Sequence, residues 1–160
     1  MGFEPVIDQR ARVLILGSFP SGASLAAQQY YAHPKNQFWG ILGAVLDQPL
    51  REMDYPDRIA AAQAAGIAVW DVFASCERAG SLDAAIRDAV ANDVSGLRKL
   101  APALRRVCFN GRMAARRVRE VEALGFEALI LPSTSPAHAR MDFAEKLARW
   151  RAALQTLAGA

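Results

Sequence analysis

Four short apolar runs are spread along the chain, and each is followed at once by a glycine, a proline or a polar residue. They occupy positions 13–16, 67–70, 107–109 and 128–131. Their apolar residues are continuous rather than alternating, which is typical of strands buried on both faces, as in a parallel sheet. The pattern therefore predicts four buried parallel strands.

Between these runs, apolar residues recur three and four positions apart, as they do on one face of a helix. The two clearest stripes are formed by Phe38, Ile41, Leu42 and Val45, and by Leu147, Trp150, Leu154 and Leu157. Strands that alternate with helices predict an α/β protein, a three-layer α/β/α sandwich with a central four-stranded parallel sheet. Ligands of such sheets bind at the carboxyl ends of the strands, so the residues that follow the four runs are the first candidates for function.

Composition narrows the class of protein. The 160 residues are 52% hydrophobic and 22% charged, a balance typical of a folded domain, and the length suits a single domain over residues 1–160. No apolar run approaches the ~20 residues of a membrane span, and the N-terminal segment lacks the pattern of a signal peptide. Cys76 and Cys108 match no zinc or redox spacing, so we expect buried thiols, no metal, no cofactor and a cytoplasmic protein.

The basic residues of the chain are mostly arginines. The net charge is +3 and the pI about 9.2, and six arginines fall between positions 105 and 119. A guanidinium group binds phosphate through two hydrogen bonds, which favours a polyanionic partner. Arginines on a solvated helix face would give the same composition, so charge alone leaves both interpretations open.

The first two segments after the opening strand carry the most distinctive residues. Positions 17–20 read Gly-Ser-Phe-Pro, with a glycine that permits close backbone approach and a proline that fixes a turn. Residues 30–39 combine aromatic rings with His33 and Asn36, which suits a flat heteroaromatic ligand. Alternatively, the rings cap the core and Asn36 caps a helix that begins near Gln37.

The last two runs end in polar residues. Asn110 follows the third run, and its amide can donate and accept together, as the edge of a nucleobase requires. The alternative is an Asx turn that starts a helix at Gly111. The fourth run leads into a polar loop over residues 132–140 with two prolines. Ser133, Ser135 and His138 lie in this loop, but no nucleophile-elbow sequence is present, which argues against a serine hydrolase.

Four segments together resemble the uracil-DNA glycosylase superfamily, and most closely its hypoxanthine-DNA (deoxyinosine) glycosylase branch. They read GSFPSGASL, YYAHPKNQFWGIL, VCFNG and LPSTSPAHAR and span nearly the whole chain. The run from Tyr31 to Trp39 is also similar to the mismatch-specific uracil glycosylases. The resemblance implies a monomeric enzyme that flips a deaminated base out of DNA and hydrolyses its N-glycosidic bond.

The resemblance also implies roles for single residues. Asn36 matches the asparagine that the hypoxanthine branch uses in catalysis, Tyr31 the ring that stacks on the extruded base, and Asn110 the amide that reads the base edge. The implied substrate-binding residues are Gly17, Ser18, Phe19, Pro20, Tyr31, His33, Phe38, Asn110 and Ser133. The implied DNA-binding residues are Lys35, Arg112, Ser135, Ala137, His138 and Arg140.

The first loop departs from the superfamily pattern. Most uracil-active branches carry an Asp, Asn or Glu there to position the attacking water, whereas this chain has Ser18 and Phe19. Without a carboxylate, we expect catalysis by stabilisation of the departing base. The expected donors are the amides of Asn36 and Asn110 and the backbone N–H groups of Ser18 and Phe19.

The last loop departs as well. Ala137 stands where a bulky wedge residue is expected, so His138, Arg140 or Met141 would enter the duplex instead.

Two other functions stay open. Uracil has an oxo and N–H edge similar to that of hypoxanthine, so a uracil or mismatch-specific uracil glycosylase is the first alternative. A non-catalytic DNA-binding relative is the second, because it is compatible with the missing carboxylate. We expect Lys35, Lys99 and Lys146 at the surface, and therefore no strand cleavage through a Schiff base.

Overall fold

The computed structural model describes residues 3–77, 87–136 and 141–158. A four-stranded sheet forms its centre, in the order β2-β1-β5-β6 with every neighbouring pair parallel. The strands are β1 (Val13–Gly17), β2 (Ile67–Asp71), β5 (Arg106–Asn110) and β6 (Glu127–Leu131). All four apolar runs lie in these strands, so the predicted parallel sheet is confirmed.

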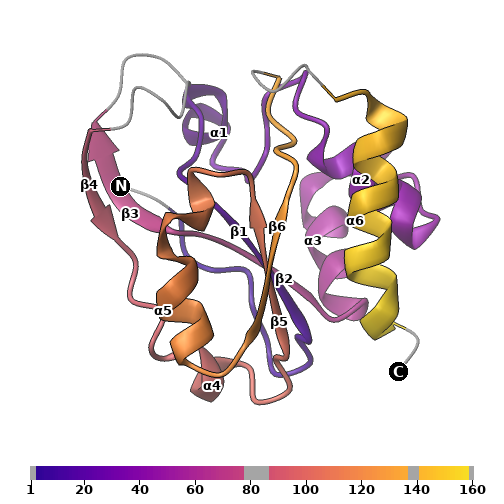
Figure 1. Cartoon of the computed structure of the whole chain (residues 1–160). Helices are drawn as coiled ribbons and strands as arrows, with labels where there is room; N and C mark the ends of the chain where they lie inside the picture. The colour runs from indigo at the N-terminus through magenta and orange to yellow at the C-terminus, as the bar shows by residue number, and fades with distance from the viewer. Residues whose placement is uncertain (1–2, 78–86, 137–140, 159–160) are drawn as a thin grey trace.

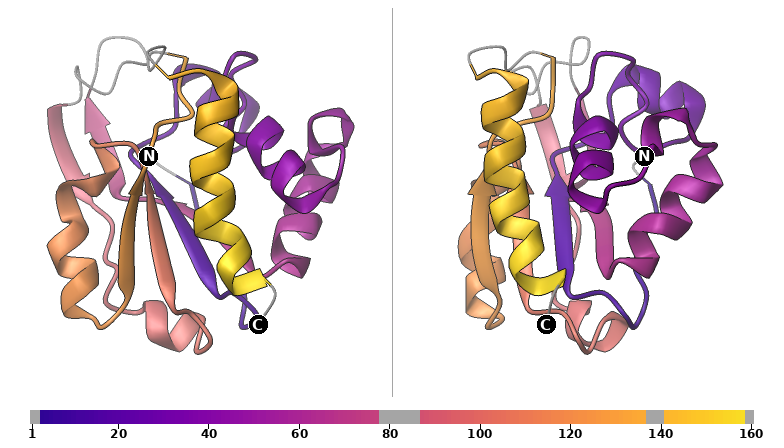
Figure 2. Two further views of the ribbon diagram at one scale, coloured as in Figure 1. Left: turned by 45° about the vertical axis from the view of Figure 1, so that its right-hand side comes forward. Right: turned by 90° about the vertical axis from the view of Figure 1, so that its right-hand side faces the viewer.

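Helices cover both faces of the sheet (Figures 1 and 2). One layer is formed by α2 (Phe38–Leu46), α3 (Tyr55–Ala64) and α6 (Phe143–Ala158). The other contains α4 (Leu97–Leu100), the 3-10 turn η3 (Ala114–Arg117) and α5 (Val118–Ala123). Two further short helical pieces are α1 (Gly22–Ala27) and η1 (Leu50–Glu52). This is the α/β/α sandwich that the sequence predicts.

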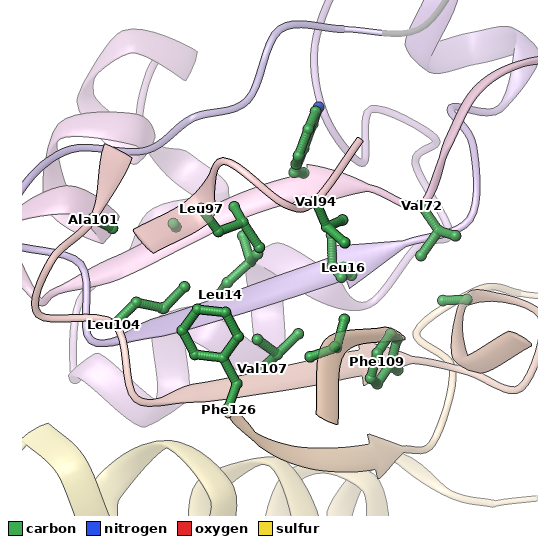
Figure 3. Close-up of a cluster of buried hydrophobic side chains, with 14 of the residues drawn as sticks. Leu14, Leu16, Val72, Val94, Leu97, Ala101, Leu104, Val107, Phe109 and Phe126 are labelled. Carbon is green, nitrogen blue, oxygen red and sulfur yellow. The ribbon is translucent and has the colours of Figure 1, made fainter. Parts of the chain in front are cut away.

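Alternate residues of each strand enter the two cores, as the pleat of a strand requires. Val13 and Ile15 of β1 pack with α2, α3 and α6. Leu14 and Leu16 pack on the opposite side, with Leu97 of α4 and other apolar residues (Figure 3). All five residues of β1 are buried, which explains why its sequence is apolar without alternation.

A second sheet was not predicted. It pairs β3 (Phe73–Glu77) with β4 (Arg87–Ala91) in antiparallel fashion, and its register is irregular. Their apolar residues form only the short runs Phe73-Ala74 and Ala89-Val90-Ala91. Short runs made mostly of alanine are a weak strand signal, because alanine is depleted in strands.

The structure describes only one of the two cysteine side chains. Cys108 is buried in β5, as predicted, and burial raises the pKa of its thiol to about 12. The side chain of Cys76 lies outside the described residues. In the described part of the chain, no helix is long and apolar enough to cross a membrane.

Candidate active site

The carboxyl ends of the four parallel strands meet at one pocket. It lies at the upper end of the sheet in Figure 1. The sequence-predicted residues that line it are Gly17, Ser18, Phe19, Pro20, Tyr31, Asn36, Asn110, Ser133 and Ser135. The lining residues that had no predicted role are Ser21, Ser24, Tyr30, Asp71 and Thr134. Most of the predicted site is therefore one continuous surface.

The first loop is tied to the aromatic segment by serine hydroxyls. Ser21 is the N-cap of α1, and its hydroxyl accepts a hydrogen bond from the backbone N–H of Ser24 at 3.1 Å. The Ser24 hydroxyl, itself buried, accepts from the backbone N–H of Ala32 at 3.0 Å. These bonds hold the residue before Ala32, which is Tyr31, against the pocket.

Tyr31 presents its ring to the pocket in an unfavourable backbone conformation. Its φ is +55°, in the left-handed region, which costs a residue with a Cβ of the order of 1–3 kcal/mol. Its ring stacks on Phe38 with centroids 4.0 Å apart and planes 18° apart. Phe38 is 1% exposed and is not among the pocket residues. The structure thus places Phe38 behind Tyr31 rather than in the pocket, and it does not support the predicted direct contact of Phe38 with substrate.

Tyr30 supports this arrangement from the core. Burial, and next the nearby Asp71 carboxylate, raise the pKa of the Tyr30 hydroxyl. The hydroxyl donates to the backbone oxygen of Glu4 at 2.8 Å, and the Trp39 indole donates to the Tyr30 backbone oxygen at 3.0 Å. Tyr30 is thus fixed at both its backbone and its ring.

Asn36 lies directly before the N-cap of α2 and lines the pocket. Its Oδ1 accepts from the backbone N–H of Phe38 at 2.9 Å, at the first turn of α2. The helix begins at Phe38, close to the predicted start, but its N-cap is Gln37, which makes no side-chain capping bond. Asn36 therefore closes an Asx turn onto the first helical N–H rather than acting as the N-cap. His33 does not line the pocket, because its Nδ1 turns to accept from the backbone N–H of Lys35 at 3.1 Å. The expected contact of His33 with substrate is therefore not supported.

Asn110 lines the pocket, but its amide is engaged with Thr134. Asn110 Nδ2 donates to the Thr134 hydroxyl at 3.0 Å, and Asn110 Oδ1 accepts from the Thr134 backbone N–H at 3.0 Å. Both residues are buried. The expectation of an amide aimed into the pocket with donor and acceptor together needs correction, since Asn110 uses one of each to hold the loop after β6. The alternative Asx turn is not formed by these bonds either.

The pocket contains a carboxylate that the sequence analysis missed. Asp71 ends β2, is 4% exposed and lines the pocket. A Cβ built on Gly17 would lie 2.7 Å from Asp71 Oδ1 and 2.8 Å from the Tyr31 hydroxyl oxygen, so both groups lie directly over Gly17. The expectation of a site without a carboxylate is wrong. The available signal was the position of Asp71 directly after the apolar run of β2.

Of the predicted cations, Lys35, Lys99 and Arg112 are exposed. Lys146 is 2% exposed, so its expected surface position is wrong. Within the arginine-rich stretch, Arg106 is paired with Glu127 at 3.0 Å and Arg117 with Glu120 at 2.8 Å. Part of the basic charge is therefore paired with carboxylates of the same chain.

The predicted DNA-binding residues of the last loop fall in two groups. Ser135 lines the pocket, and its backbone N–H donates to the Ser133 hydroxyl at 3.1 Å. Ala137, His138 and Arg140 lie outside the described residues. Among the side chains that are described, no three His, Cys, Asp or Glu residues gather as they would around a metal ion.

Comparisons with known proteins agree on one family. The sequence model of the "Uracil DNA glycosylase superfamily" matches residues 4–158. A protein of Methanosarcina acetivorans named "Hypoxanthine DNA glycosylase" is 40% identical over 141 residues, which are 88% of this chain and 89% of the relative. A protein of Methanosarcina barkeri with the same name is 40% identical over 139 residues, which are 87% and 88% of the two chains.

A solved structure of a related protein has the same fold as this chain. The solution NMR structure of a candidate uracil DNA glycosylase from Methanosarcina acetivorans superposes with a TM-score of 0.89 at 38% identity. The match covers 98% of this chain and 96% of that one.

Proposed function

Because this chain belongs to the uracil DNA glycosylase superfamily, we propose that it is a monofunctional DNA glycosylase that releases hypoxanthine from deoxyinosine in DNA. The observation that carries the proposal is the pocket in which Asn36, Tyr31 and Asp71 meet at the carboxyl ends of the strands. The two relatives named "Hypoxanthine DNA glycosylase" support the choice of base.

The flipped base would stack on Tyr31, whose ring is backed by Phe38 at 4.0 Å. A base leaves the stack at a cost of a few kcal/mol, and a mispaired inosine lowers that cost. Asn36 Oδ1 is already occupied by the Phe38 N–H, so the amide offers its NH2 group to the ligand. A donor at this position stabilises the negative charge that develops on the departing base.

Asp71 supplies the group that the first loop lacks. Water attacks C1′ of the sugar as the bond to the base nitrogen breaks, the bonding electron pair leaves with the base, and the base later takes a proton from solvent. We assign the proton lost by the water to the Asp71 carboxylate, whose negative charge also favours the cationic sugar. The carboxylate is 4% exposed, and this exclusion of solvent strengthens its electrostatic effect.

The duplex would lie across the mouth of the pocket. Lys35 and Arg112 are exposed and adjoin segments that line the pocket, where they can bind phosphates. The roles of Ala137, His138, Arg140 and Met141 at the flanking phosphates and as a wedge stay predictions, as do a monomeric state and a cytoplasmic location. No lysine lines the pocket among the residues described, which supports base release without strand cleavage.

The test uses matched duplexes that contain one inosine, uracil or xanthine, incubated with the purified protein and EDTA. Alkali then converts abasic sites into strand breaks that a gel resolves. We expect breaks at inosine that depend on both the protein and the alkali. Breaks without alkali would contradict the monofunctional assignment.

A uracil glycosylase is the second candidate, and the observation that favours it is the 38% identity to the solved structure of a candidate uracil DNA glycosylase. Breaks at uracil alone would establish this function. Binding to all three duplexes without breaks would establish the non-catalytic DNA-binding alternative.

A further inference from the structure

A buried lysine joins the C-terminal helix to the residue beside Asn36. Lys146 lies in the first turns of α6 and is 2% exposed. Its Nζ donates to Gln37 Oε1 at 2.9 Å. Burial lowers the pKa of Lys146, which shows that the site disfavours the charge. A methionine or leucine would fill this space without that cost, so packing alone does not explain a lysine here.

The same helix holds the loop that follows β6. Trp150 lies one turn after Lys146, and its indole N–H donates to the backbone oxygen of Pro132 at 2.9 Å. Helix α6 thus binds two segments of the pocket wall, one at Gln37 and the other at Pro132. Since residues four apart lie on one face of a helix, the two anchors act on the same side of α6.

The two segments are also bonded to each other. The Gln37 backbone N–H donates to the Thr134 backbone oxygen at 3.0 Å, and Thr134 in turn is held by Asn110. Gln37 is therefore fixed by its side chain to α6 and by its backbone to the loop after β6. Its position decides that of Asn36, because Asn36 Oδ1 is bonded to the N–H of Phe38, on the other side of Gln37.

We propose that Lys146 is a positioning residue for base release: its ammonium group fixes Gln37, and through Gln37 it sets the direction of the Asn36 amide. Lys146 does not itself line the pocket. The proposal rests on the proposed function, because it assumes that the Asn36 amide acts on the departing base.

The first test is Lys146→Met, which keeps an unbranched side chain one heavy atom shorter and removes the donor and the charge. The release of hypoxanthine from an inosine duplex is measured in a single turnover with excess enzyme, and binding to a duplex with a stable abasic-site analogue is measured separately. We expect the rate to fall about 100-fold, the effect of misplacing a catalytic group by about 1 Å, with binding unchanged. Lys99→Met makes the same chemical change on the exposed face of α4 and is expected to behave as the unaltered protein.

The second test is a double-mutant cycle with Gln37→Leu, which removes the acceptor Oε1 and keeps the backbone N–H bonded to Thr134. The single variants and the double variant are expected to lose the same factor in rate, because each breaks the same contact. Losses that multiply would overturn the proposal, as would an unchanged rate in Lys146→Met. If Lys146→Met does not fold, Gln37→Leu alone decides: a normal rate contradicts the proposal.

The outcomes separate this inference from the proposed function. If the unaltered protein releases no base, the proposed function fails. If it releases hypoxanthine and both variants do so at the same rate, only the role of Lys146 fails. A fall in rate matched by an equal fall in DNA binding would assign Lys146 to general folding of the loops and would also overturn the proposal.

Discussion

Gly17 is the position where a small change in volume has the largest effect on the candidate site. An alanine Cβ there would lie 2.7 Å from Asp71 Oδ1 and 2.8 Å from the Tyr31 hydroxyl oxygen. Ordinary contacts to a Cβ begin near 3.4 Å, so the Asp71 oxygen has to retreat by about 0.7 Å and the Tyr31 oxygen by about 0.6 Å. Gly17→Ala therefore displaces the carboxylate and the stacking ring together.

The displacement predicts a large loss of activity with a smaller loss of stability. A shift of this size in a catalytic group lowers the rate by about 10- to 100-fold. Overpacking of a buried site costs about 1–3 kcal/mol of folding free energy. Single-turnover release of hypoxanthine measures the first effect, and thermal unfolding measures the second.

Gly96 offers a matched control. It precedes α4 with a φ of −84°, and a Cβ there would meet nothing within 4 Å. Gly96→Ala is expected to leave rate and stability unchanged. If Gly17→Ala released hypoxanthine at the normal rate, the close approach of Asp71 and Tyr31 would have no part in the reaction and the reasoning would be refuted.

Three further predictions concern Asp71, Thr134 and Cys108. Asp71→Asn removes the proton acceptor, and we expect the rate of base release from inosine to fall by at least about 100-fold. The rate on any other substrate should fall by the same factor. A changed preference between bases would instead assign Asp71 to base recognition. Thr134→Val removes the hydroxyl that accepts from Asn110 Nδ2, and leaving this buried donor unsatisfied should cost about 1–3 kcal/mol in denaturant unfolding; no loss of stability would mean that water replaces the bond. The Cys108 thiol, with a pKa of about 12, should resist alkylation at pH 8 in the folded protein and react once it is unfolded, as peptide mass analysis would show; rapid reaction in the folded state would contradict its burial. The resistance at pH 8 follows from the raised pKa of Cys108, because its thiol stays protonated well above the pH at which an exposed cysteine ionises.

The sheet could be predicted because its strands are buried on both faces. A short, continuous apolar run such as the one in β1 is typical of a strand that lies between two layers of helices, and the order of strands and helices then fixes the layers. The β3–β4 pair could not be predicted in this way, because its short apolar runs consist mostly of alanine, which is a weak strand former.

The site was predicted less completely, because its residues owe their positions to contacts across the fold. In the sequence, Asp71 is simply the residue that ends a strand. The pairing of β2 with β1 is what brings its side chain over Gly17. Lys146 lies four residues before Trp150, on the face of α6 that carries the apolar stripe, so its position did signal burial. Because lysines are almost always exposed, its residue type predicted the opposite, and only the contact with Gln37 shows that it is buried. Phe38 carries the same aromatic signal as Tyr31, and the stacking of one ring on the other decides which of them lines the pocket.

In the proposed function, this pocket breaks the bond between hypoxanthine and its deoxyribose, and the Asn36 amide acts on the departing base. The most direct measurement is the mass-spectrometric identification of the base released from an inosine duplex by the unaltered protein and by Asn36→Ala, with binding to an abasic-site duplex measured in parallel. We expect free hypoxanthine in equal amount to abasic sites for the unaltered protein, and strongly reduced release with normal binding for Asn36→Ala. Full release by Asn36→Ala, or abasic sites without free hypoxanthine, would contradict it.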